Sequence, residues 1–401
     1  MTSSTSPLLD KTQSPLRFGI LGAARIGPDA LFTPAKTHPE VAVVAVACRD
    51  EARGSKYARQ HHISKVHSGP QAYHDLVADP DIDVVYIPLP VSMHFEWSMR
   101  ALHAGKHVLV EKPMTSTADE ARQIFALAEQ KGLVALEAIH CTFVSSSLLP
   151  QRRRHPRSFH PVLQRVREIV RSSELGRVKS VRAAFAWPSV VARFLFPRDD
   201  IRFNYEMGGG CMMDMGVYPL TAVRYVTGAD TAALEVTSAT AVGHASDPAR
   251  IDRAMHATYA LPDSVTAETF ADLSAPGWGP FGLIPRWPQI GLSVALEGGD
   301  VEVFNPLDPG VYHHIRVKPK RGSSRTEKHY RYADGRGEKN WHSYTFQLHA
   351  FVDKVRGRAP WAWTEPTTTI TAIETMERIY VKAGLPPRVA STYKPETSQE
   401  Q

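Results

Sequence analysis

A short apolar run followed by a glycine turn constrains the fold of this chain more than any other feature. Residues 17–21 read RFGIL and lead directly into GAARIG at residues 22–27, after which a helix-like stretch begins. Gly22, Ala24 and Gly27 occupy a GxGxxG frame, with alanine in place of the second glycine. A tight turn between a buried strand and a helix aims backbone N–H groups at a pyrophosphate, so the pattern predicts a dinucleotide site. A purely structural turn is the alternative, because one imperfect GxGxxG is a weak signal.

Strands and helices alternate from this turn to about residue 138. Continuous apolar runs, without polar alternation, predict strands that are buried on both faces, as in a parallel sheet. Thr117 and Glu120 form a capping-box pattern at the start of the last helix. The sequence therefore predicts an α/β unit with a doubly wound parallel sheet. Strands are expected at 17–21, 41–47, near 65, at 84–87 and at 107–110, with helices at 51–60, around 73–77, at 95–105 and at 117–132.

The pattern changes after residue 138, and strand-like runs dominate from residue 178. Several of these runs alternate apolar and polar residues, which favours a large, mainly antiparallel sheet with one face in water. We therefore expect a second, α+β domain. Its strands are expected at 178–185, 234–242, 254–260, 267–273, 290–296, 301–304 and 313–317, and its helices at 161–171, around 218–226, at 343–355 and at 368–383.

Length and composition agree with a folded chain of two domains. The chain has 401 residues, whereas a typical domain has about 150. Its apolar content of 43% and charged content of 22% exclude a disordered protein. Cys48, Cys141 and Cys211 are too scattered for a disulfide framework and form no CxxC zinc pair, so we expect no metal site and a reducing compartment. Residues 1–15 do not read as a signal peptide, and no apolar run is long enough to span a membrane, so we expect a cytoplasmic protein.

The end of the second strand carries a basic residue at the position where a dinucleotide site distinguishes NADP from NAD. A site that prefers NAD places an acid there to bind the ribose 2′-hydroxyl. In this chain the order is Cys48, Arg49, Asp50, with Arg53 following. A guanidinium matches a 2′-phosphate bidentately, so we expect NADP in preference to NAD. An ordinary polar loop after a strand is the alternative interpretation.

Two further motifs carry residues suited to proton transfer. The segment AGKHVLVEKPM at 104–114 puts Glu111 and Lys112 at the carboxyl end of a buried strand, where ligands bind in such sheets. The segment GGGCMMDMGVY at 208–218 holds Asp214 and Tyr218 four residues apart, on one face if helical. Each also has a simpler interpretation: a surface Glu–Lys pair, a capping aspartate and a core tyrosine.

The ordered combination of segments is more specific than any one of them. GILGAARIG, SMHFEW, AGKHVLVEKP, GGGCMMDMGVY, QLHAFVDKVRG and ERIYVKAGLP together resemble the glucose-fructose oxidoreductase, inositol dehydrogenase and MocA family, over nearly all of residues 16–388. Within the family the chain is most similar to a fungal-type branch with dimeric dihydrodiol dehydrogenase and NADP-dependent D-xylose 1-dehydrogenase. The resemblance implies an N-terminal Rossmann domain and a C-terminal open sheet that binds substrate on one face and often a second subunit on the other.

The resemblance also assigns roles to single residues. It implies that Lys112 touches the substrate hydroxyl and the nicotinamide ribose, that Tyr218 is the general acid/base in place of a histidine, and that Asp214 orients the reacting groups. Arg202 is expected near the substrate pocket, and His94 is expected to line the cofactor cleft. The full set expected at the cofactor is Gly22, Ala24, Arg25, Ile26, Gly27, Arg49, Arg53, Pro88, His94, Glu111 and Lys112.

The implied reaction is reversible hydride transfer between NADP and a carbon of a sugar or vicinal diol. Oxidation of D-xylose or of a trans-dihydrodiol are the leading candidates, and reduction of a carbonyl in a secondary-metabolite pathway stays open. A dinucleotide-binding sensor without turnover is the alternative from a different class. We expect a sugar or diol as ligand and a homodimer through the C-terminal sheet, and no nucleic-acid or membrane partner.

Two departures from the family pattern stand out. Val91 follows Pro90 where relatives carry an asparagine. Residues 141–158, CTFVSSSLLPQRRRHPRS, interrupt the family pattern before Phe159 and predict a basic inserted loop that is functional, passive or an artefact of the gene model. The expected organisation is a tail at 1–15, a cofactor domain at 16–139, a substrate domain at 140–367, a bracing C-terminal helix at 368–388 and a tail at 389–401.

Overall fold

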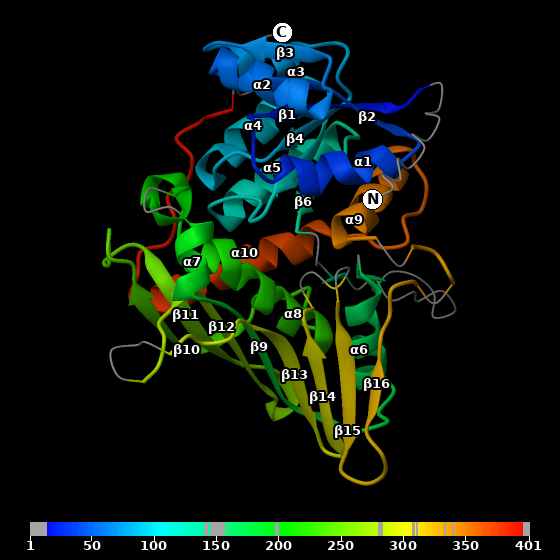
Figure 1. Ribbon diagram of the computed structural model, residues 1–401, viewed down its shortest axis with the longest axis vertical. Helices are drawn as coiled ribbons and strands as arrows, with labels where there is room; N and C mark the ends of the chain where they lie inside the picture. Colours follow the sequence, from blue (N-terminus) through cyan, green and yellow to red (C-terminus); the bar gives the residue numbers. More distant parts are fainter. Residues whose placement is uncertain are drawn as a thin grey trace, which may run out of the picture.

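Two β-sheets organise the chain, one in each half of the sequence (Figure 1). No helix among the residues described below is long and apolar enough to cross a membrane. Cys48 and Cys211 are buried free thiols, whereas Cys141 lies outside the described residues. The computed structural model describes residues 14–139, 143–144, 157–158, 160–196, 200–279, 284–306, 309, 312–332, 334–338 and 341–395.

The first sheet is parallel throughout and has the order β3-β2-β1-β4-β5-β6. This order reverses direction between β1 and β4, and in such sheets ligands bind beyond the carboxyl ends of the strands at this point. The predicted doubly wound sheet is therefore confirmed. The strands are β1 (Leu16–Leu21), β2 (Val41–Cys48), β3 (Lys65–Ser68), β4 (Val84–Ile87), β5 (His107–Glu111) and β6 (Ala135–Ala138). The helices are η1 (Pro28–Phe32), α1 (Thr33–Thr37), α2 (Glu51–His61), α3 (Ala72–Ala78), α4 (Val91–His103) and α5 (Ala118–Gln130).

The helix starts in this unit follow from local sequence. The Thr117 hydroxyl accepts a hydrogen bond from the Glu120 N–H, and the Glu120 carboxylate accepts one from the Thr117 N–H, so the predicted capping box is present at α5. Strand β6 was not among the expected strands, because its four residues ALEA include a buried glutamate and give no clear strand pattern.

The second sheet is mixed rather than uniformly antiparallel. Its order is β10-β11-β12-β9-β13-β14-β15-β16, and β12 runs parallel to β9, with Thr266 beside Ser180. The chain leaves β9 through helices and returns at the sheet edge, and a hairpin then brings β12 alongside β9 in the same direction. The remaining pairs are antiparallel, so the mainly antiparallel prediction holds for the sheet as a whole. The strands are β9 (Val178–Pro188), β10 (Glu235–Gly243), β11 (Asp252–Ala260), β12 (Thr266–Ala275), β13 (Gln289–Leu296), β14 (Gly299–Phe304), β15 (His314–Pro319) and β16 (Arg325–Glu327).

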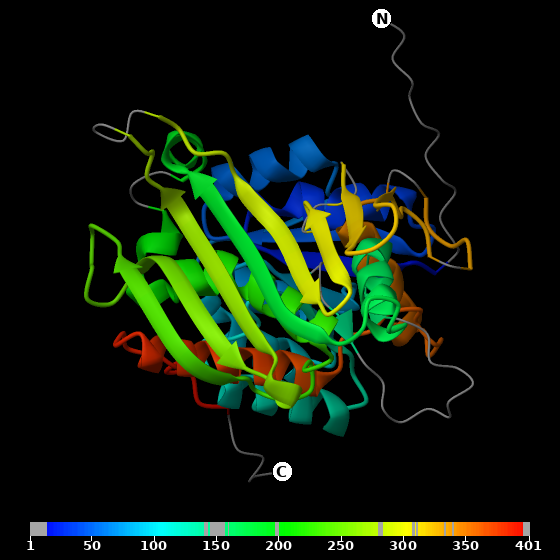
Figure 2. The same ribbon diagram turned by 90° about the horizontal axis from the view of Figure 1, so that it is seen from below.

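Helices cover one broad face of the second sheet, and Figure 2 shows the other face open toward the viewer. Along β9, Val181 and Ala183 are buried against the helices, whereas the Arg182 side chain is 67% exposed on the open face. This alternation is the expected pattern of a sheet with one face in water. The helices and turns of this half are α6 (Pro161–Arg171), α7 (Ser189–Leu195), η3 (Ile201–Phe203), η4 (Tyr205–Met207), η5 (Met212–Gly216), α8 (Val217–Thr227), η6 (Pro262–Ser264), α9 (Ser343–Val355) and α10 (Pro366–Lys382).

Two short strands, β7 (Phe143–Val144) and β8 (Arg157–Ser158), form a separate antiparallel pair. They lie within the predicted insertion at 141–158. The rest of that segment lies outside the described residues, as do residues 1–13 of the predicted N-terminal tail and residues 396–401 of the C-terminal one.

The C-terminal helix α10 contacts both units, and in the second unit its Thr375 hydroxyl accepts a hydrogen bond from the Leu234 N–H (3.1 Å). The Glu377 carboxylate accepts a hydrogen bond from the Ala118 N–H at the start of α5 (3.1 Å), and the Thr369 hydroxyl donates to Glu137 on β6 (2.9 Å). The helix ends at Lys382, one residue before the end of the helix expected at 368–383. The bracing helix expected to reach 388 is shorter than that, because the chain continues without helix to Arg388 and beyond. We propose that the first unit ends at residue 139, as predicted.

Candidate active site

The glycine turn after β1 packs too closely to accept larger residues. Gly22 has φ of +84°, and a Cβ there would lie 3.3 Å from the Leu89 side chain. A Cβ on Gly27 would lie 2.3 Å from the Tyr57 hydroxyl, which itself donates a hydrogen bond to the Ala24 carbonyl (2.7 Å). The backbone of the turn is therefore held open at the carboxyl end of β1, as a pyrophosphate-binding turn requires.

The end of β2 is followed by Arg49 and by an aspartate that caps helix α2. Arg49 is exposed directly after the strand. The Asp50 carboxylate caps α2 by accepting a hydrogen bond from the Arg53 N–H (2.8 Å). The Arg53 guanidinium donates to the Ala23 carbonyl (3.0 Å) and so joins α2 to the glycine turn. At this corner Arg49 and Arg53 are both exposed, and the Arg49 side chain also hydrogen-bonds with Tyr73.

His94 ties together the loops that follow β4 and β5. Its ring is 1% exposed, with Nδ1 3.0 Å from the Pro113 carbonyl oxygen and Nε2 2.7 Å from the Leu89 carbonyl oxygen. Burial lowers the pKa of His94 below its ordinary value. Because both ring nitrogens face backbone oxygens, we propose that His94 shapes the wall of the cleft beside half-buried Pro88 rather than binding the cofactor through its ring nitrogens.

Glu111 points away from solvent. Its carboxylate accepts hydrogen bonds from the Tyr86 hydroxyl (2.6 Å) and from the Lys112 N–H (3.2 Å). Burial raises the pKa of Glu111. These bonds engage both carboxylate oxygens inside the protein, so in place of the expected cofactor contact we propose that Glu111 holds the backbone from which Lys112 projects.

Lys112 reaches from the end of β5 to the second unit. It precedes a cis peptide bond to Pro113, and its Nζ donates to Asp214 Oδ1 (2.8 Å) and to the Asp214 carbonyl oxygen (2.5 Å). The other carboxylate oxygen of Asp214 accepts from Arg202 Nε (2.7 Å). Burial alone would raise the pKa of Asp214, but the Lys112 and Arg202 cations hold it well below its ordinary value. Asp214 is therefore ionised, and its carboxylate holds the Lys112 amine in a fixed position.

Tyr218 lies on the other side of the same amine. Its ring centre is 4.8 Å from Lys112 Nζ, and the ring packs edge-on against Phe185 of β9 at 5.6 Å. The π-helical turn η5 carries Asp214 and runs directly into α8, which begins at Val217. Pro219 therefore falls in the first turn of α8, where a proline is tolerated. The structure brings Lys112, Asp214 and Tyr218 together.

Arg202 lies in the short helical turn η3, ahead of the glycine run at 208–210, and contacts the Lys112–Asp214 pair through Asp214. Its guanidinium bonds Asp200 (2.9 Å) as well as Asp214, and it lies 4.9 Å from the centre of the Phe196 ring. The expected role of Arg202 in substrate binding stays a proposal, since two of its nitrogens hold carboxylates of the protein. Arg25 and Ile26 lie in the glycine turn, exposed and half-buried respectively.

Sequence reasoning missed two residues of this neighbourhood. Asp200 stands two positions before Arg202, and a DxR spacing is too common to single out. Tyr73 lies on α3, with its hydroxyl 3.6 Å from the position of a Cβ on Gly22, and it hydrogen-bonds with the Arg49 side chain. No motif around it in the sequence QAYHD singles it out.

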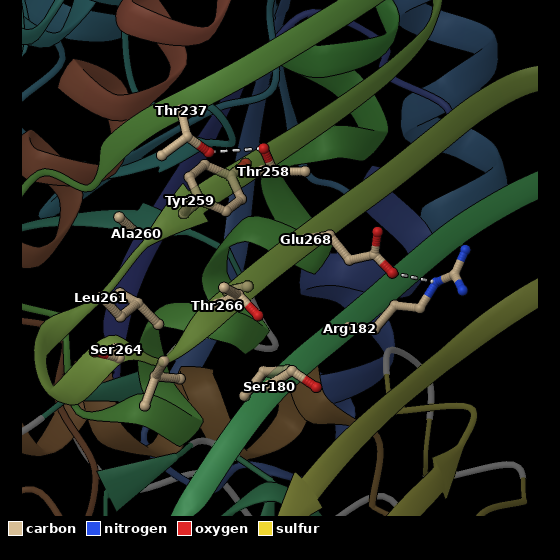
Figure 3. A pocket seen from close by; sticks show the side chains of 13 residues that line it. Ser180, Arg182, Thr237, Thr258, Tyr259, Ala260, Leu261, Ser264, Thr266 and Glu268 are labelled. Carbon is tan, nitrogen blue, oxygen red and sulfur yellow. Dashed lines mark hydrogen bonds and ion pairs between the residues drawn. The ribbon is translucent and has the colours of Figure 1, made fainter.

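A separate depression of about 630 Å³ lies on the open face of the second sheet (Figure 3). Arg182 and Glu268 form an ion pair there at 2.9 Å, beside Thr237 and Thr258. Arg182 points to the face of β9 opposite Val181, which packs against the helices. This depression is therefore on the far side of the sheet from Tyr218 and is no part of the candidate active site.

Comparison with known proteins agrees with the fold. Residues 16–138 match the model of an oxidoreductase family with an NAD-binding Rossmann fold, and residues 163–284 match the Gfo/Idh/MocA C-terminal domain. A 3-ketoreductase from Actinomadura kijaniata, solved with NADP and TDP-benzene, superposes with a TM-score of 0.73 at 23% identity, covering 93% of this chain and 98% of that one. An aldose-aldose oxidoreductase from Caulobacter crescentus gives 0.71 at 21%, covering 92% and 97%.

Curated relatives match at higher identity over a shorter span. A dTDP-3,4-didehydro-2,6-dideoxy-alpha-D-glucose 3-reductase of Streptomyces antibioticus is 38% identical over 54% of this chain. An NADP(+) D-xylose 1-dehydrogenase of Haloferax volcanii is 37% identical over 53%, and a trans-1,2-dihydrobenzene-1,2-diol dehydrogenase of Xenopus laevis is 32% identical over 53%. The matched part spans only 56–58% of the length of these relatives. The two family matches together cover more than half of the chain, which belongs to the glucose-fructose oxidoreductase, inositol dehydrogenase and MocA family of oxidoreductases.

Proposed function

We propose that this protein is an NADP-dependent oxidoreductase that acts on a secondary alcohol, hemiacetal or carbonyl carbon of a sugar or diol. The observation that carries the proposal is the meeting of Lys112 with Asp214 and Tyr218. The amine at the end of a nucleotide-fold strand lies 2.8 Å from a carboxylate and 4.8 Å from a phenol ring of the second unit. Such a grouping beside a dinucleotide crevice is suited to proton transfer during hydride transfer.

The residues around the crevice fit NADP. The positive φ of Gly22 and the crowding at Gly27 keep both positions free of side chains, and their N–H groups bond the Ala47 and Ala24 carbonyls. A pyrophosphate would therefore bind the N–H groups of the residues between them. Arg49 stands exposed where the 2′-phosphate of NADP would lie, and Asp50 is occupied as a helix cap. A bound NADP supplies the hydride donor or acceptor at its nicotinamide carbon.

Each residue of the central group has a distinct task in this proposal. Asp214 and Arg202 fix the position of the Lys112 amine, which donates a hydrogen bond to the reacting oxygen. Tyr218 exchanges the proton of that oxygen as general acid or base. The ammonium of Lys112 lies over the Tyr218 ring, so it stabilises negative charge that develops on the phenol and on the substrate oxygen.

The leading substrates are D-xylose and trans-dihydrodiols, each named in a relative that matches about half of this chain. Reduction of a sugar ketone is a second candidate, because several of the matched relatives are dTDP-sugar 3-reductases at up to 38% identity. Both directions use the same proton path, so the structure is compatible with either.

A substrate panel tests the proposal. Purified protein should form NADPH, measured at 340 nm, with at least one aldose or diol, or consume NADPH with a keto sugar. Absence of any signal across the panel, together with intact NADP binding, would instead support the sensor interpretation.

Full-length protein and a variant without residues 143–158 should be compared, since equal turnover would show that the inserted segment is passive.

Replacing Arg49 by aspartate should reverse cofactor preference. The substitution removes the guanidinium that faces the 2′-phosphate and adds a carboxylate that suits the ribose hydroxyls of NAD. We expect kcat/KM for NADP to fall about 100-fold, while that for NAD stays the same or rises. Arg59→Asp, at the exposed end of helix α2 that follows Arg49, is the matched control and should change neither value. An unaltered preference in Arg49→Asp would remove Arg49 from the cofactor site.

We propose further that two copies associate through the open face of the second sheet. Within the part of the chain that the structure describes, no helix covers this face, which carries a threonine pair, Thr237 and Thr258, linked by a 2.8 Å hydrogen bond. The active-site group lies on the opposite side, so association there leaves the crevice accessible.

The buried free thiols Cys48 and Cys211 support our proposal of a cytoplasmic, reducing location.

A further inference from the structure

A fully buried charge cluster lies directly behind the turn that carries Asp214. Asp252, the first residue of β11, accepts hydrogen bonds at Oδ1 from Arg388 (2.8 Å) and from the Tyr380 hydroxyl (3.0 Å). Its other oxygen accepts from the Met212 N–H at 2.6 Å. The side chains of Asp252 and Arg388 have no exposed area. A buried ion pair is costly to desolvate and by itself adds little net stability, so its contribution to geometry has to be considered.

The cluster presses against Gly210. This glycine has φ of +127°, and a Cβ there would lie 2.3 Å from Asp252 Oδ1 and 2.5 Å from Arg388 Nη2. Only glycine allows the turn to pass so close to the ion pair. The charges of the cluster therefore fix the path of the backbone at Gly210 and, through the N–H of Met212, at the start of η5.

Gly210 in turn connects both partners of the ion pair in the active site. Its N–H donates to the Arg202 carbonyl (2.8 Å), and its carbonyl accepts from the Asp214 N–H (3.0 Å). Any movement of Gly210 would therefore displace Arg202 and Asp214 together. Lys112, which is held by Asp214, would lose its fixed position as a consequence.

We propose that Asp252 and Arg388 are positioning residues, which hold the Gly210–Met212 backbone and thereby place Asp214 against the Lys112 amine. The segment after α10, to which Arg388 belongs, thus serves the active site as well as linking the two units. The catalytic consequence rests on the proposed function. The geometric claim is that the buried cluster holds Lys112 through Asp214, and this claim is independent of the proposed function.

Asp252→Asn is the primary test, because the amide has nearly the same shape but only one acceptor oxygen. It cannot accept from the Met212 N–H and from Arg388 at the same time. We expect kcat to fall about 10- to 100-fold, because small displacements of reacting groups carry losses of this order. KM for NADP should change less than about threefold, because the glycine turn and Arg49 are untouched.

A double-mutant cycle separates positioning from general loss of structure. If Asp252 acts through Asp214, adding Asp252→Asn to Asp214→Asn should lower kcat by less than about twofold. Losses that multiply in the double variant would overturn the positioning role. Arg388→Lys, which keeps the charge but loses the planar fork, should show the same coupling and replaces Asp252→Asn if that variant does not fold.

A measurement without turnover tests the geometric claim separately. Acylation of lysines by an N-hydroxysuccinimide ester, followed by mass spectrometry, reports how firmly Lys112 is held. Its rate should rise about threefold in Asp252→Asn, as its ion pair loosens. The rate at Lys106, whose ammonium bonds the Asp79 and Ile82 carbonyls, should stay unchanged and serves as internal reference.

Arg224→Lys is the matched control, because Arg224 is equally buried but bonds the Thr368 and Asp230 carbonyls. It should leave Lys112 labelling at the wild-type rate. Faster labelling in Asp252→Asn without any turnover of the wild type would refute the proposed function and retain the positioning claim. Labelling at the wild-type rate in Asp252→Asn would overturn the positioning claim, whatever the activity.

Discussion

Lys112→Ala should abolish most turnover, with kcat lowered about 1,000-fold or more. The substitution removes the amine that Asp214 and its carbonyl hold at 2.8 and 2.5 Å, and with it the only proposed hydrogen-bond donor from the first unit to the substrate oxygen. Steady-state kinetics with the best substrate of the panel measure the loss. NADP binding, measured by fluorescence titration, should weaken less than about threefold, because the glycine turn and Arg49 are untouched.

Lys106→Ala provides the control for Lys112→Ala. Lys106 precedes the same strand, and its ammonium bonds the Asp79 and Ile82 carbonyls. It should lower stability without a comparable loss of kcat. Retention of more than about a tenth of wild-type turnover in Lys112→Ala, or loss of NADP binding, would show that the role of this residue is misassigned.

Tyr218→Phe should lower kcat about 100-fold, which is in the range expected for loss of a general acid or base. The phenylalanine ring keeps the edge-on contact with Phe185 and the position beside Lys112, so only the exchangeable proton is lost. The pH–rate profile should also lose the limb that the phenol contributes. KM for NADP should stay within about threefold of the wild type.

Tyr259→Phe is the control for Tyr218→Phe, because it also removes one buried hydroxyl. The Tyr259 hydroxyl bonds Thr269 at 2.7 Å within the second sheet, away from Lys112. Its loss should reduce the free energy of unfolding by about 1 kcal/mol and leave kcat unchanged. An equal kcat in Tyr218→Phe and wild type, with the same pH dependence, would rule out the phenol as proton donor and acceptor.

Much of the first unit could be predicted because its elements depend on local patterns. The β-branched run of β2 and the cap at Thr117 each specify their element within a few residues. The order of the second sheet could not be predicted, because the parallel pairing of β9 with β12 joins residues 86 positions apart, such as Thr266 and Ser180.

The candidate site was predictable only in part for the same reason. Lys112 and Asp214 are 102 positions apart, and their proximity came from the family resemblance rather than from spacing. The second bonds of Glu111 and His94 were not predicted, because which polar group a buried side chain finds depends on packing. Asp252 and Arg388 carry no motif at all, and only the folded backbone at Gly210 shows their connection to the site.

The most direct test of the central claim is a crystal structure of the protein with NADP and D-xylose, or with the substrate that the panel selects. The account predicts the reacting oxygen within about 2.6–3.2 Å of both Lys112 Nζ and the Tyr218 hydroxyl, with its carbon about 3–3.5 Å from the nicotinamide ring. A ligand that contacts neither side chain, or a nicotinamide bound away from them, would contradict it.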